Sequence, residues 1–294
     1  MRLLVTGSRG QLGRALGKAL ASPRAPEAYR GCTVDWVDLD ELDISDDEAC
    51  TRWFLGHEGY DVVFNCAAFT NVDGCESDFP SAFAANALGP MNLARACAAT
   101  ATTFVHISTD YVFPGDVPGE RVESETPRPI SAYGRSKLAG EGLALAANPR
   151  THIVRTAWLY GEGRNFVRTM LGLAERFDEV TVVNDQLGNP TSADDLAAEL
   201  LRIALSEDFG IWHCTNEGTC SWADLAEAAF ELTGAECRVV RCTSADWKRM
   251  HPESADRPAF SSLANTHLRD TIGNHMRPWR EALSDYLGRG QGVA

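Results

Sequence analysis

The sequence has no apolar run of the length needed to span a membrane, no CxxC or HExxH motif, and no repeat or low-complexity tract. It is also short of basic residues: 27 Lys and Arg face 41 Asp and Glu, which gives a formal net charge of −14. A surface of this sign repels nucleic acids and anionic membranes, so we expect neither as a partner. An anionic small molecule is not excluded, because a few local cations suffice to bind one.

Cysteine is present but shows no pattern. Nine cysteines are scattered along the 294 residues, and later pairs such as Cys214 with Cys220 do not have zinc-ribbon spacing. The N-terminal residues MRLLVTGSRG lack the apolar stretch and cleavage site of a signal peptide. We therefore expect a cytoplasmic protein with reduced, mostly buried thiols and no bound metal.

The first half of the chain alternates short apolar runs with longer helical stretches. The predicted strands are residues 3–5, 33–37, 61–65, 103–107 and 152–155, and the predicted helices are residues 10–20, 46–55, 81–99 and 132–147. Such alternation is typical of βαβ units and a parallel sheet. Continuous apolar runs such as Val62-Val63-Phe64 suit strands that are buried on both faces.

The second half is less regular. Helical periodicity covers residues 166–177, 193–206 and 222–233, the last between the N-cap Ser221 and Gly234, and short strands are predicted at 210–214 and 237–241. The sequence thus predicts an α/β fold with a Rossmann-type, doubly wound parallel sheet in residues 1–160. Residues 161–294 are expected to form mainly a smaller C-terminal substrate-binding lobe, with some segments returning to the first domain.

A glycine-rich turn follows the first strand directly. Leu3-Leu4-Val5-Thr6 leads into Gly7-Ser8-Arg9-Gly10-Gln11-Leu12-Gly13, a GxxGxxG pattern between a strand and a helix. Glycines let the backbone turn sharply and approach a pyrophosphate at the helix N-terminus, and Gly13 lets the helix pack closely on the sheet. A glycine turn without a ligand is the alternative, but the place of the turn in a βαβ pattern favours dinucleotide binding.

An acidic residue after the second strand is expected to hold the hydroxyls of the adenosine ribose. Asp38 is the predicted residue, with Asp35 and Asp40 as alternatives. A carboxylate here favours NADH, because it repels the 2′-phosphate of NADPH. Arg9 acts in the opposite direction, since it lies in the loop and can pair with that phosphate. The sequence therefore leaves both NADH and NADPH open as the cofactor.

The next turn offers a second contact at the same end of the predicted site. Asp43 and Ile44 are candidate contacts to the adenine, and the alternative is a turn leading into a helix that is capped near Ser45.

A candidate catalytic group combines a helix start with a strand end. Tyr133 and Lys137 form a YxxxK pattern, which places both side chains on one face of the helix. A nearby ammonium favours the phenolate, so such a tyrosine can act as an acid or base closer to neutral pH. Thr109 ends an apolar strand at the sheet edge where ligands bind, and its hydroxyl can align a substrate carbonyl with Tyr133.

At this point the sequence resembles a known family. The strings are residues 7–13, NCAAFTNVD at 65–73, STDYVF at 108–113, YGRSK at 133–137, RTAWLY at 155–160, NDQLGNPT at 184–191 and Arg257-Pro258. Together they resemble the extended short-chain dehydrogenase/reductases, and within them the dTDP-4-dehydrorhamnose reductase family, over nearly the whole chain.

The resemblance implies a role for each matched position. Thr109, Tyr133 and Lys137 would be catalytic, the last two also contacting the cofactor. The pyrophosphate would be held by Gly7, Gly10, Gln11, Leu12 and Gly13, and the nicotinamide side would be lined by Ala67, Ala68 and Thr70. The sugar nucleotide would contact Val72, Thr109, Tyr111, Trp158, Asn165 and Arg257.

Some matched positions have structural alternatives. Core packing is an equal alternative for Trp158, and a surface salt bridge is the alternative for Arg257. Asn65 and Asn86 are expected to anchor strands to helices instead of binding a ligand.

The resemblance also implies the reaction: NAD(P)H reduces the C4 ketone of a 4-keto-6-deoxy nucleotide sugar, giving dTDP-L-rhamnose or a related product. Another nucleotide-sugar ketoreductase, an epimerase or a non-catalytic dinucleotide-binding subunit are the alternatives. A dehydratase is disfavoured, since Tyr111 stands where those enzymes place a glutamate base. Phe260 and Ser262 replace an Asn and an Arg that are frequent in the family, so the substrate contact there is expected to differ.

The resemblance also bears on the oligomeric state of the protein. A homodimer is compatible with it, because some relatives hold a divalent metal at a dimer contact through acidic residues. Asp194 lies where such a residue would fall. We expect a solvated helix-start aspartate there instead of a metal ligand.

Overall fold

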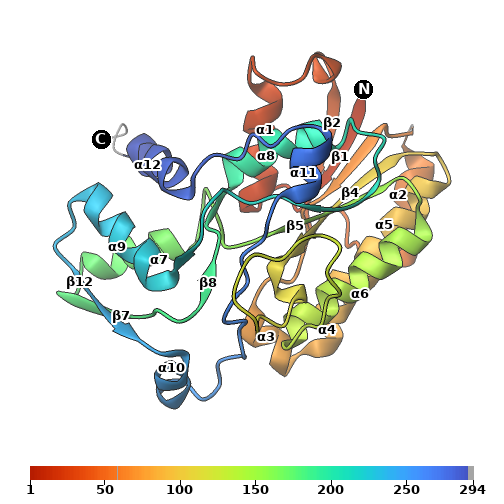
Figure 1. Cartoon of the computed structure of the whole chain (residues 1–294). Helices are drawn as coiled ribbons and strands as arrows, with labels where there is room; N and C mark the ends of the chain where they lie inside the picture. Colours follow the sequence, from red (N-terminus) through yellow and green to blue (C-terminus); the bar gives the residue numbers. More distant parts are fainter. Residues whose placement is uncertain (58, 291–294) are drawn as a thin grey trace.

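A computed structural model describes residues 1–57 and 59–290 of the chain (Figure 1). Six parallel strands form the main sheet in the order β10-β5-β4-β3-β1-β2. They are β1 (Arg2–Thr6), β2 (Thr33–Val37), β3 (Val62–Asn65), β4 (Thr103–Thr109), β5 (Thr151–Thr156) and β10 (Gly210–His213). The predicted α/β fold with a Rossmann-type sheet is confirmed.

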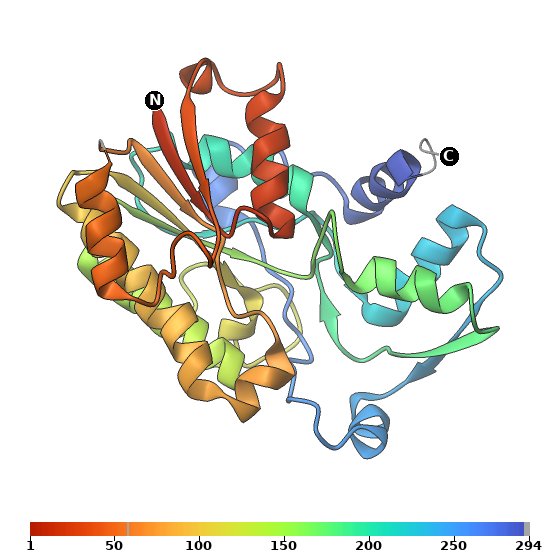
Figure 2. The same cartoon turned by 180° about the vertical axis from the view of Figure 1, so that it is seen from behind.

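Helices cover both faces of this sheet, because successive side chains of each strand point to opposite faces. Leu3 and Val5 pack with residues of α1 (Gln11–Ala21) and α8 (Ala193–Ile203), whereas Leu4 packs on the other face with Leu93. Figure 2 shows α2 (Asp47–Gly56), α5 (Gly89–Ala98) and α6 (Ala132–Ala147) together on that second face.

The predicted helix over residues 81–99 is interrupted. The segment consists of α4 (Phe79–Phe83), a π-helical turn η2 (Ala84–Leu88) and α5. Gly89 N–H bonds to the carbonyl of Ala84, five residues back, and the next residue, Pro90, has no N–H to donate. A Cβ on Gly140 would lie 2.1 Å from the Asn86 carbonyl oxygen, so α6 packs directly against this turn.

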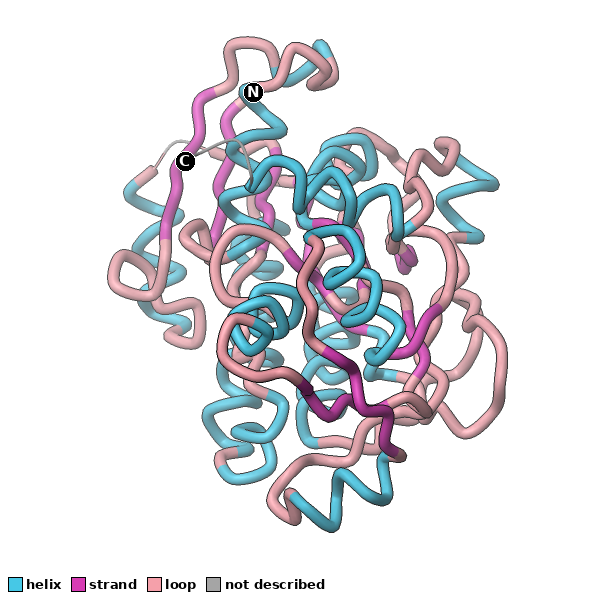
Figure 3. Tube along the Cα trace, turned by 90° about the vertical axis from the view of Figure 1, so that its left-hand side faces the viewer, coloured by secondary structure: helices cyan, strands magenta, loops and turns pink. Residues whose placement is uncertain are grey.

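The C-terminal lobe contains short paired strands and four helices. The pairs are β6 (Leu159–Tyr160) with β9 (Thr191–Ser192), β7 (Glu179–Val183) with β12 (Arg238–Cys242), and β8 (Leu187–Gly188) with β11 (Cys220–Ser221). The helices are α7 (Phe166–Ala174), α9 (Trp222–Thr233), α10 (Ser244–Met250) and α12 (Trp279–Gly290). Figure 3 views the molecule from the side of this lobe.

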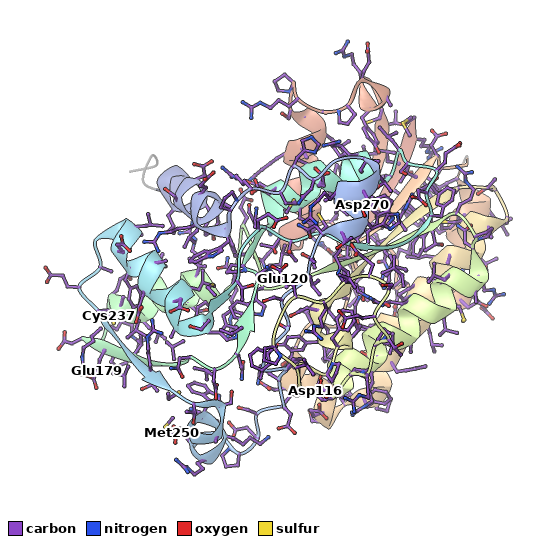
Figure 4. All side chains as sticks on the ribbon, viewed as in Figure 1. Asp116, Glu120, Glu179, Cys237, Met250 and Asp270 are labelled. Carbon is purple, nitrogen blue, oxygen red and sulfur yellow. The ribbon has the colours of Figure 1, made fainter. Side chains whose placement is uncertain are left out.

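Not all later segments belong to that lobe. Strand β10 extends the main sheet, α8 packs on α1, and α11 (Thr266–Thr271) packs on β10. In Figure 4, Glu179 and Cys237 lie at the far end of the C-terminal lobe, whereas Asp270 of α11 lies over the main sheet.

The remaining short elements lie in the connections. They are η1 (Glu27–Tyr29), α3 (Val72–Ser77) and η3 (Asp110–Val112). Within residues 1–57 and 59–290, no helix is long and apolar enough to cross a bilayer.

The strand order reverses between β1 and β3, since the chain goes from β1 outward to β2 and then returns to the other side of β1. In open α/β sheets, ligands bind in the crevice at the carboxyl ends of the strands at such a point. The fold therefore places a binding crevice beside Thr6 and Asn65.

Candidate active site

A cavity of about 720 Å³ opens at this edge of the sheet. Its walls come from the ends of β1, β3, β4 and β5, from the start of α6, and from Trp222 of α9. The predicted site residues that line it are Gly7, Gly10, Gln11, Leu12, Asp38, Asp43, Ile44, Ala67, Ala68, Thr70, Val72, Thr109, Tyr111, Tyr133, Lys137 and Trp158. Arg9, Gly13, Asn165 and Arg257 are not among the lining residues.

The glycine turn has the shape of a phosphate cradle. Gly7 has a φ of +65°, and a Cβ there would lie 2.6 Å from the backbone nitrogen of Ala67, so only glycine fits. A Cβ on Gly13 would lie 2.5 Å from the Gly7 carbonyl oxygen, which explains the close packing of α1 on the turn. Gly10 caps α1 without a side-chain hydrogen bond, and Gly10, Gln11 and Leu12 line the cavity, so the first turn of α1 borders it.

One polar atom beside this turn supports a bound dinucleotide. The Gln11 side-chain oxygen is buried and has no hydrogen-bond partner among the described residues. A buried polar atom without a partner is costly, and a ligand in the cavity would supply one. The open cradle and this unpartnered atom both fit a dinucleotide.

Asp38 lies at the other end of the cradle and is held there by the backbone. Its carboxylate accepts hydrogen bonds from the N–H groups of Arg9 and Leu39, both at 2.9 Å. Burial acts to raise the pKa of Asp38, but these two bonds and the Arg9 charge outweigh it, so the pKa lies below its usual value. Asp38 is therefore ionised where the adenosine ribose is expected.

The Arg9 side chain is already paired. Its guanidinium contacts Asp40 and lies 3.5 Å from Glu41. These two carboxylates compete with any phosphate for the same cation. Asp43, which also lines the cavity, accepts hydrogen bonds from the N–H and hydroxyl of Ser45.

The proposed catalytic side chains, Thr109, Tyr133 and Lys137, all line this cavity. Lys137 is 2% exposed, its Nζ donates to the Ile107 carbonyl at 2.6 Å, and burial lowers its pKa to about 8. Burial and the nearby Asp110 raise the pKa of Tyr133, whereas a hydrogen bond with Thr109 opposes the rise. Tyr133 is therefore protonated near neutral pH.

Sequence reasoning missed Asp110. It lines the cavity, is 2% exposed, and accepts the Thr109 hydroxyl at 2.9 Å. Burial raises its pKa to about 7, so it can hold a proton near neutral pH. Its position directly after Thr109 at the strand end was a signal that could have identified it.

Trp222 was missed too, and it forms one wall with Trp158. The two indoles stack with centroids 3.6 Å apart and planes 7° apart, and both line the cavity. Trp158 has a φ of +45°, which is strained for a side chain of this size. A Cβ on Gly188 would lie 2.5 Å from its ring, so the indole fills a slot between Gly188 and Trp222. Nothing in sequence spacing could show this contact.

Two matched positions hold the structure together around the cavity. Asn165 caps α7 by accepting from Arg168 N–H at 3.0 Å and donates to the Tyr286 hydroxyl at 3.0 Å. Arg257 pairs with Asp73 of α3 at 3.0 Å, and its charge also opposes the rise that burial causes in the pKa of Tyr111. Arg257 therefore lies beside a lining residue while it joins the C-terminal segment to α3.

Asn86 and Ser262 make hydrogen bonds within the protein. Asn86 anchors the segment before α3 through two hydrogen bonds with the backbone of Phe69, at 2.8 and 3.0 Å. The Ser262 hydroxyl accepts from Thr219 at 2.9 Å within the C-terminal lobe. In the part of the chain that the structure describes, no group of three or more His, Cys, Asp or Glu could hold a metal ion.

The parallel sheet, the glycine turn and the Tyr–Lys helix beside a strand-end threonine define a short-chain dehydrogenase/reductase. The family described as RmlD substrate binding domain matches residues 1–291. The dTDP-4-dehydrorhamnose reductase of Mycolicibacterium smegmatis is 42% identical over 97% of this chain and 84% of its own. A probable dTDP-4,6-dihydroxy-2-methyloxan-3-one 4-ketoreductase of Streptomyces antibioticus is 40% identical over 97% of this chain and 94% of its own.

Solved structures with a similar fold come from the same family as these relatives. A dTDP-4-dehydrorhamnose reductase from Clostridium acetobutylicum superimposes with a TM-score of 0.93, 42% identity, and coverage of 99% of this chain and 100% of the other. One from Bacillus anthracis, in complex with NADP, gives a TM-score of 0.90, 32% identity, and coverage of 98% and 99%. The chain therefore belongs to the dTDP-4-dehydrorhamnose reductase family, whose members are NAD(P)H-dependent reductases of the short-chain type. The predicted family is confirmed.

Proposed function

We propose that this chain uses NADH or NADPH to reduce the C4 ketone of dTDP-4-dehydro-L-rhamnose, giving dTDP-L-rhamnose. The observation that carries the proposal is that Thr109, Tyr133 and Lys137 line one cavity together with the glycine turn. The reacting carbonyl, the proton donor and the dinucleotide can thus be brought together in one site.

The bound cofactor supplies the hydride that adds to C4. Tyr133 holds a proton at its hydroxyl and donates it to the developing alkoxide on O4. Lys137, four residues further along α6, carries the positive charge that stabilises the resulting phenolate. These residues are proposed to act as the acid and its electrostatic support.

Thr109 is proposed to orient the ketone through its hydroxyl. That hydroxyl accepts a hydrogen bond from Tyr111 N–H at 3.2 Å, and in the structure it donates to Asp110. A threonine has only one hydroxyl proton, so it cannot donate to Asp110 and to the substrate at once. When Asp110 holds a proton, it donates to Thr109, and the Thr109 proton becomes available to the ketone.

Both dinucleotides are proposed to bind. Asp38 can accept hydrogen bonds from the two ribose hydroxyls of NADH, while Arg9 can pair with the 2′-phosphate of NADPH. Asp40 and Glu41 reduce the benefit to NADPH, because Arg9 must leave them to reach the phosphate.

The sugar nucleotide is proposed to lie on the side of the cavity toward the C-terminal lobe. Val72, Tyr111 and Trp158 line that side, with Arg257 next to Tyr111, and Trp222 adds its indole. An apolar aromatic wall suits the methyl group of a 6-deoxy sugar better than a hydroxymethyl group. Asn165 caps α7, whose first residue, Phe166, contacts the Trp222 ring.

The two parts of the chain are proposed to bind different ligands. We propose that residues 1–160 form the dinucleotide-binding domain and that residues 161–294 mainly form the substrate lobe, apart from the segments that join the main sheet.

The cysteines and the assembly bear on where and in what form the enzyme acts. Nine free cysteines suit a cytoplasmic enzyme. A homodimer is compatible with the family resemblance, and light scattering on the purified protein measures the assembly.

A related ketoreductase is the second candidate, because the Streptomyces antibioticus relative is nearly as similar as the reductases. The test is NADH oxidation with dTDP-4-dehydro-L-rhamnose and with other 4-keto and 3-keto nucleotide sugars. The proposal expects the highest kcat/KM for the first substrate. Faster turnover of another ketone assigns the second function, and epimerisation without net NADH oxidation contradicts both.

A further inference from the structure

A row of polar side chains crosses the main sheet behind the proposed catalytic lysine. Thr6 of β1 is the register partner of Asn65 of β3, which is the register partner of His106 of β4. The Thr6 hydroxyl donates to Asn65 Oδ1 at 2.7 Å, and Asn65 Nδ2 lies 3.0 Å from His106 Nδ1. The row ends where His106 Nε2 lies 3.4 Å from Lys137 Nζ.

All members of this row are buried, the most exposed being Lys137 at 2%. Polar groups in such surroundings need defined partners, because an unpaired donor or acceptor is costly. Thr6 directly precedes Gly7 of the phosphate cradle. The row thus connects the cofactor turn to the catalytic end of the cavity, although the mechanism proposed above uses only Lys137.

The orientation of the Asn65 amide is fixed by a group that can only donate. Ala67 N–H donates to Asn65 Oδ1 at 3.2 Å, so this oxygen must face Ala67 and Thr6. The NH₂ group of Asn65 therefore faces His106 Nδ1, which must be the acceptor. A neutral imidazole that accepts at Nδ1 carries its proton at Nε2.

His106 is neutral for two physical reasons. Burial, and to a smaller extent the charge of Lys137, lower the pKa of His106 well below its usual value. A neutral ring with its proton on Nε2 presents an N–H donor to Lys137 Nζ. An ammonium gains nothing from a second donor, whereas an uncharged amine can accept a hydrogen bond from it.

We propose that His106 is a positioning residue for Lys137: with its proton held on Nε2 by Asn65, it directs an N–H donor at Nζ and weakens the hold of the lysine on its proton. The inference rests on the proposed catalytic role of Lys137. Together with burial, His106 then helps to set the pH at which the lysine loses its charge.

Other titratable groups also face Lys137 and must be counted. Glu141 on the same helix and Cys66 after β3 both raise the pKa of Lys137, and burial lowers it by more. The Glu141 carboxylate is largely committed elsewhere, because it receives Arg155 of β5 at 2.7 Å and Ser108 of β4 at 2.5 Å.

From the substrate side, Tyr133 shares α6 with Lys137, and Asp110 acts on Tyr133. His106 is the group in contact with Nζ whose donor or acceptor character depends on its tautomer.

The first test is the tautomer itself, measured by long-range ¹H–¹⁵N NMR correlation on the full chain labelled with ¹⁵N-histidine. The His106 signals are identified as those lost in His106→Gln, or through bond correlations if that variant does not fold. We expect a neutral Nε2–H ring that does not titrate between pH 6 and 9, with and without NADH. A proton on Nδ1, or a ring that titrates in this range, overturns the proposal whatever the enzyme reduces.

The second test is the pH profile of kcat/KM for His106→Gln. A glutamine amide can turn its oxygen to Lys137 and favour the ammonium. The loss of kcat/KM at alkaline pH should therefore begin at a pH higher by on the order of one unit. Lower activity with an unchanged alkaline limb contradicts the proposal, because a merely structural role would give that result.

A matched control is available in His152→Gln. His152 is also a buried strand histidine that accepts at Nδ1, from Trp212 at 3.0 Å, and it is not a lining residue of the cavity. Its alkaline limb should not move. An equal shift in both variants overturns the assignment to His106.

Discussion

Charged groups inside the cavity and charged groups beside its glycine turn have very different surroundings. At the catalytic end, Lys137 and Asp110 are each 2% exposed, and burial shifts both pKa values toward the neutral forms. Beside the glycine turn, at the proposed adenosine end, the side chains of Arg9 and Asp40 are 55% and 63% exposed and form a surface ion pair. Cations and carboxylates thus lie in a low-dielectric interior at the first place and in a high-dielectric surface environment at the second.

The difference in exposure suggests different roles for the two regions. Burial shifts the pKa of a charged group strongly, so the buried catalytic end suits proton transfer. Exposed charges are screened by water and salt, so the adenosine end suits a small difference in affinity between two similar cofactors. Substitutions at the catalytic end should therefore have large effects, and substitutions at the adenosine end should have small ones.

Tyr133→Phe is expected to have the largest effect. It removes the proposed proton donor and should lower ketone reduction by roughly 10²–10⁴-fold, the usual contribution of general acid catalysis. The Kd for NADH, measured by fluorescence titration, should hardly change, because Lys137 and the glycine turn remain.

The control for this change is Tyr29→Phe, which removes a buried hydroxyl bonded to the Leu201 carbonyl at 2.9 Å, outside the cavity lining. Its kcat should stay near the original value. Wild-type reduction by Tyr133→Phe would remove Tyr133 from the mechanism.

Arg155→Met should lower stability strongly. Arg155 and Glu141 are 1% and 3% exposed, so removal of the arginine leaves a buried carboxylate without its partner. We expect a loss of about 3–5 kcal/mol in the free energy of unfolding, measured by urea denaturation. Arg52→Met, which breaks an exposed pair with Glu48, should cost about 0–1 kcal/mol. Equal losses would show that burial does not separate the two pairs.

Cofactor preference should change less. Arg9→Ala is expected to weaken NADPH more than NADH, by roughly 1.5–3 kcal/mol if a charge-assisted hydrogen bond is lost. Asp38→Ala should have the reverse effect, and Asp40→Asn should strengthen NADPH because it releases Arg9. Dissociation constants of both cofactors for each variant test this. Equal changes for the two cofactors in every variant would contradict our account of the adenosine end.

Trp222→Leu is expected to have the smallest effect. It removes a stacked partner of Trp158, an interaction of about 0.5–1.5 kcal/mol, so KM for the sugar nucleotide should rise up to roughly tenfold. The Kd for NADH should stay the same. As a control, Trp247→Leu in α10 removes a tilted ring contact with His251, just after that helix, and should leave KM unchanged. A rise in KM for both variants, or for neither, would exclude a specific role of Trp222.

Local signals in the sequence predicted much of the main sheet and the site. Helix α9 was predicted with its bounds, because the Ser221 cap and Gly234 at a φ of +71° are local features. The glycine turn, Asp38 and the Tyr133–Lys137 pair were found for the same reason. Each depends on residues that are close together in the chain.

Features that depend on distant contacts were not predicted. Strand β7 was missed although its sequence EVTVV alternates exposed and buried residues; it is short, and its partner β12 lies far along the chain. The stacking of Trp222 on Trp158 and the row from Thr6 to Lys137 join segments far apart in sequence. The π-helical turn depends on Pro90 acting together with the packing of Gly140, and helical periodicity does not show it.

The most direct test of the central claim follows the hydride. NADH deuterated at the transferring position is incubated with the enzyme and dTDP-4-dehydro-L-rhamnose, and the product is analysed by NMR and mass spectrometry. The account predicts one deuterium at C4 of the sugar and one NADH oxidised per product formed. A product without deuterium at C4, or no NADH oxidation by an enzyme that binds both ligands, would contradict it.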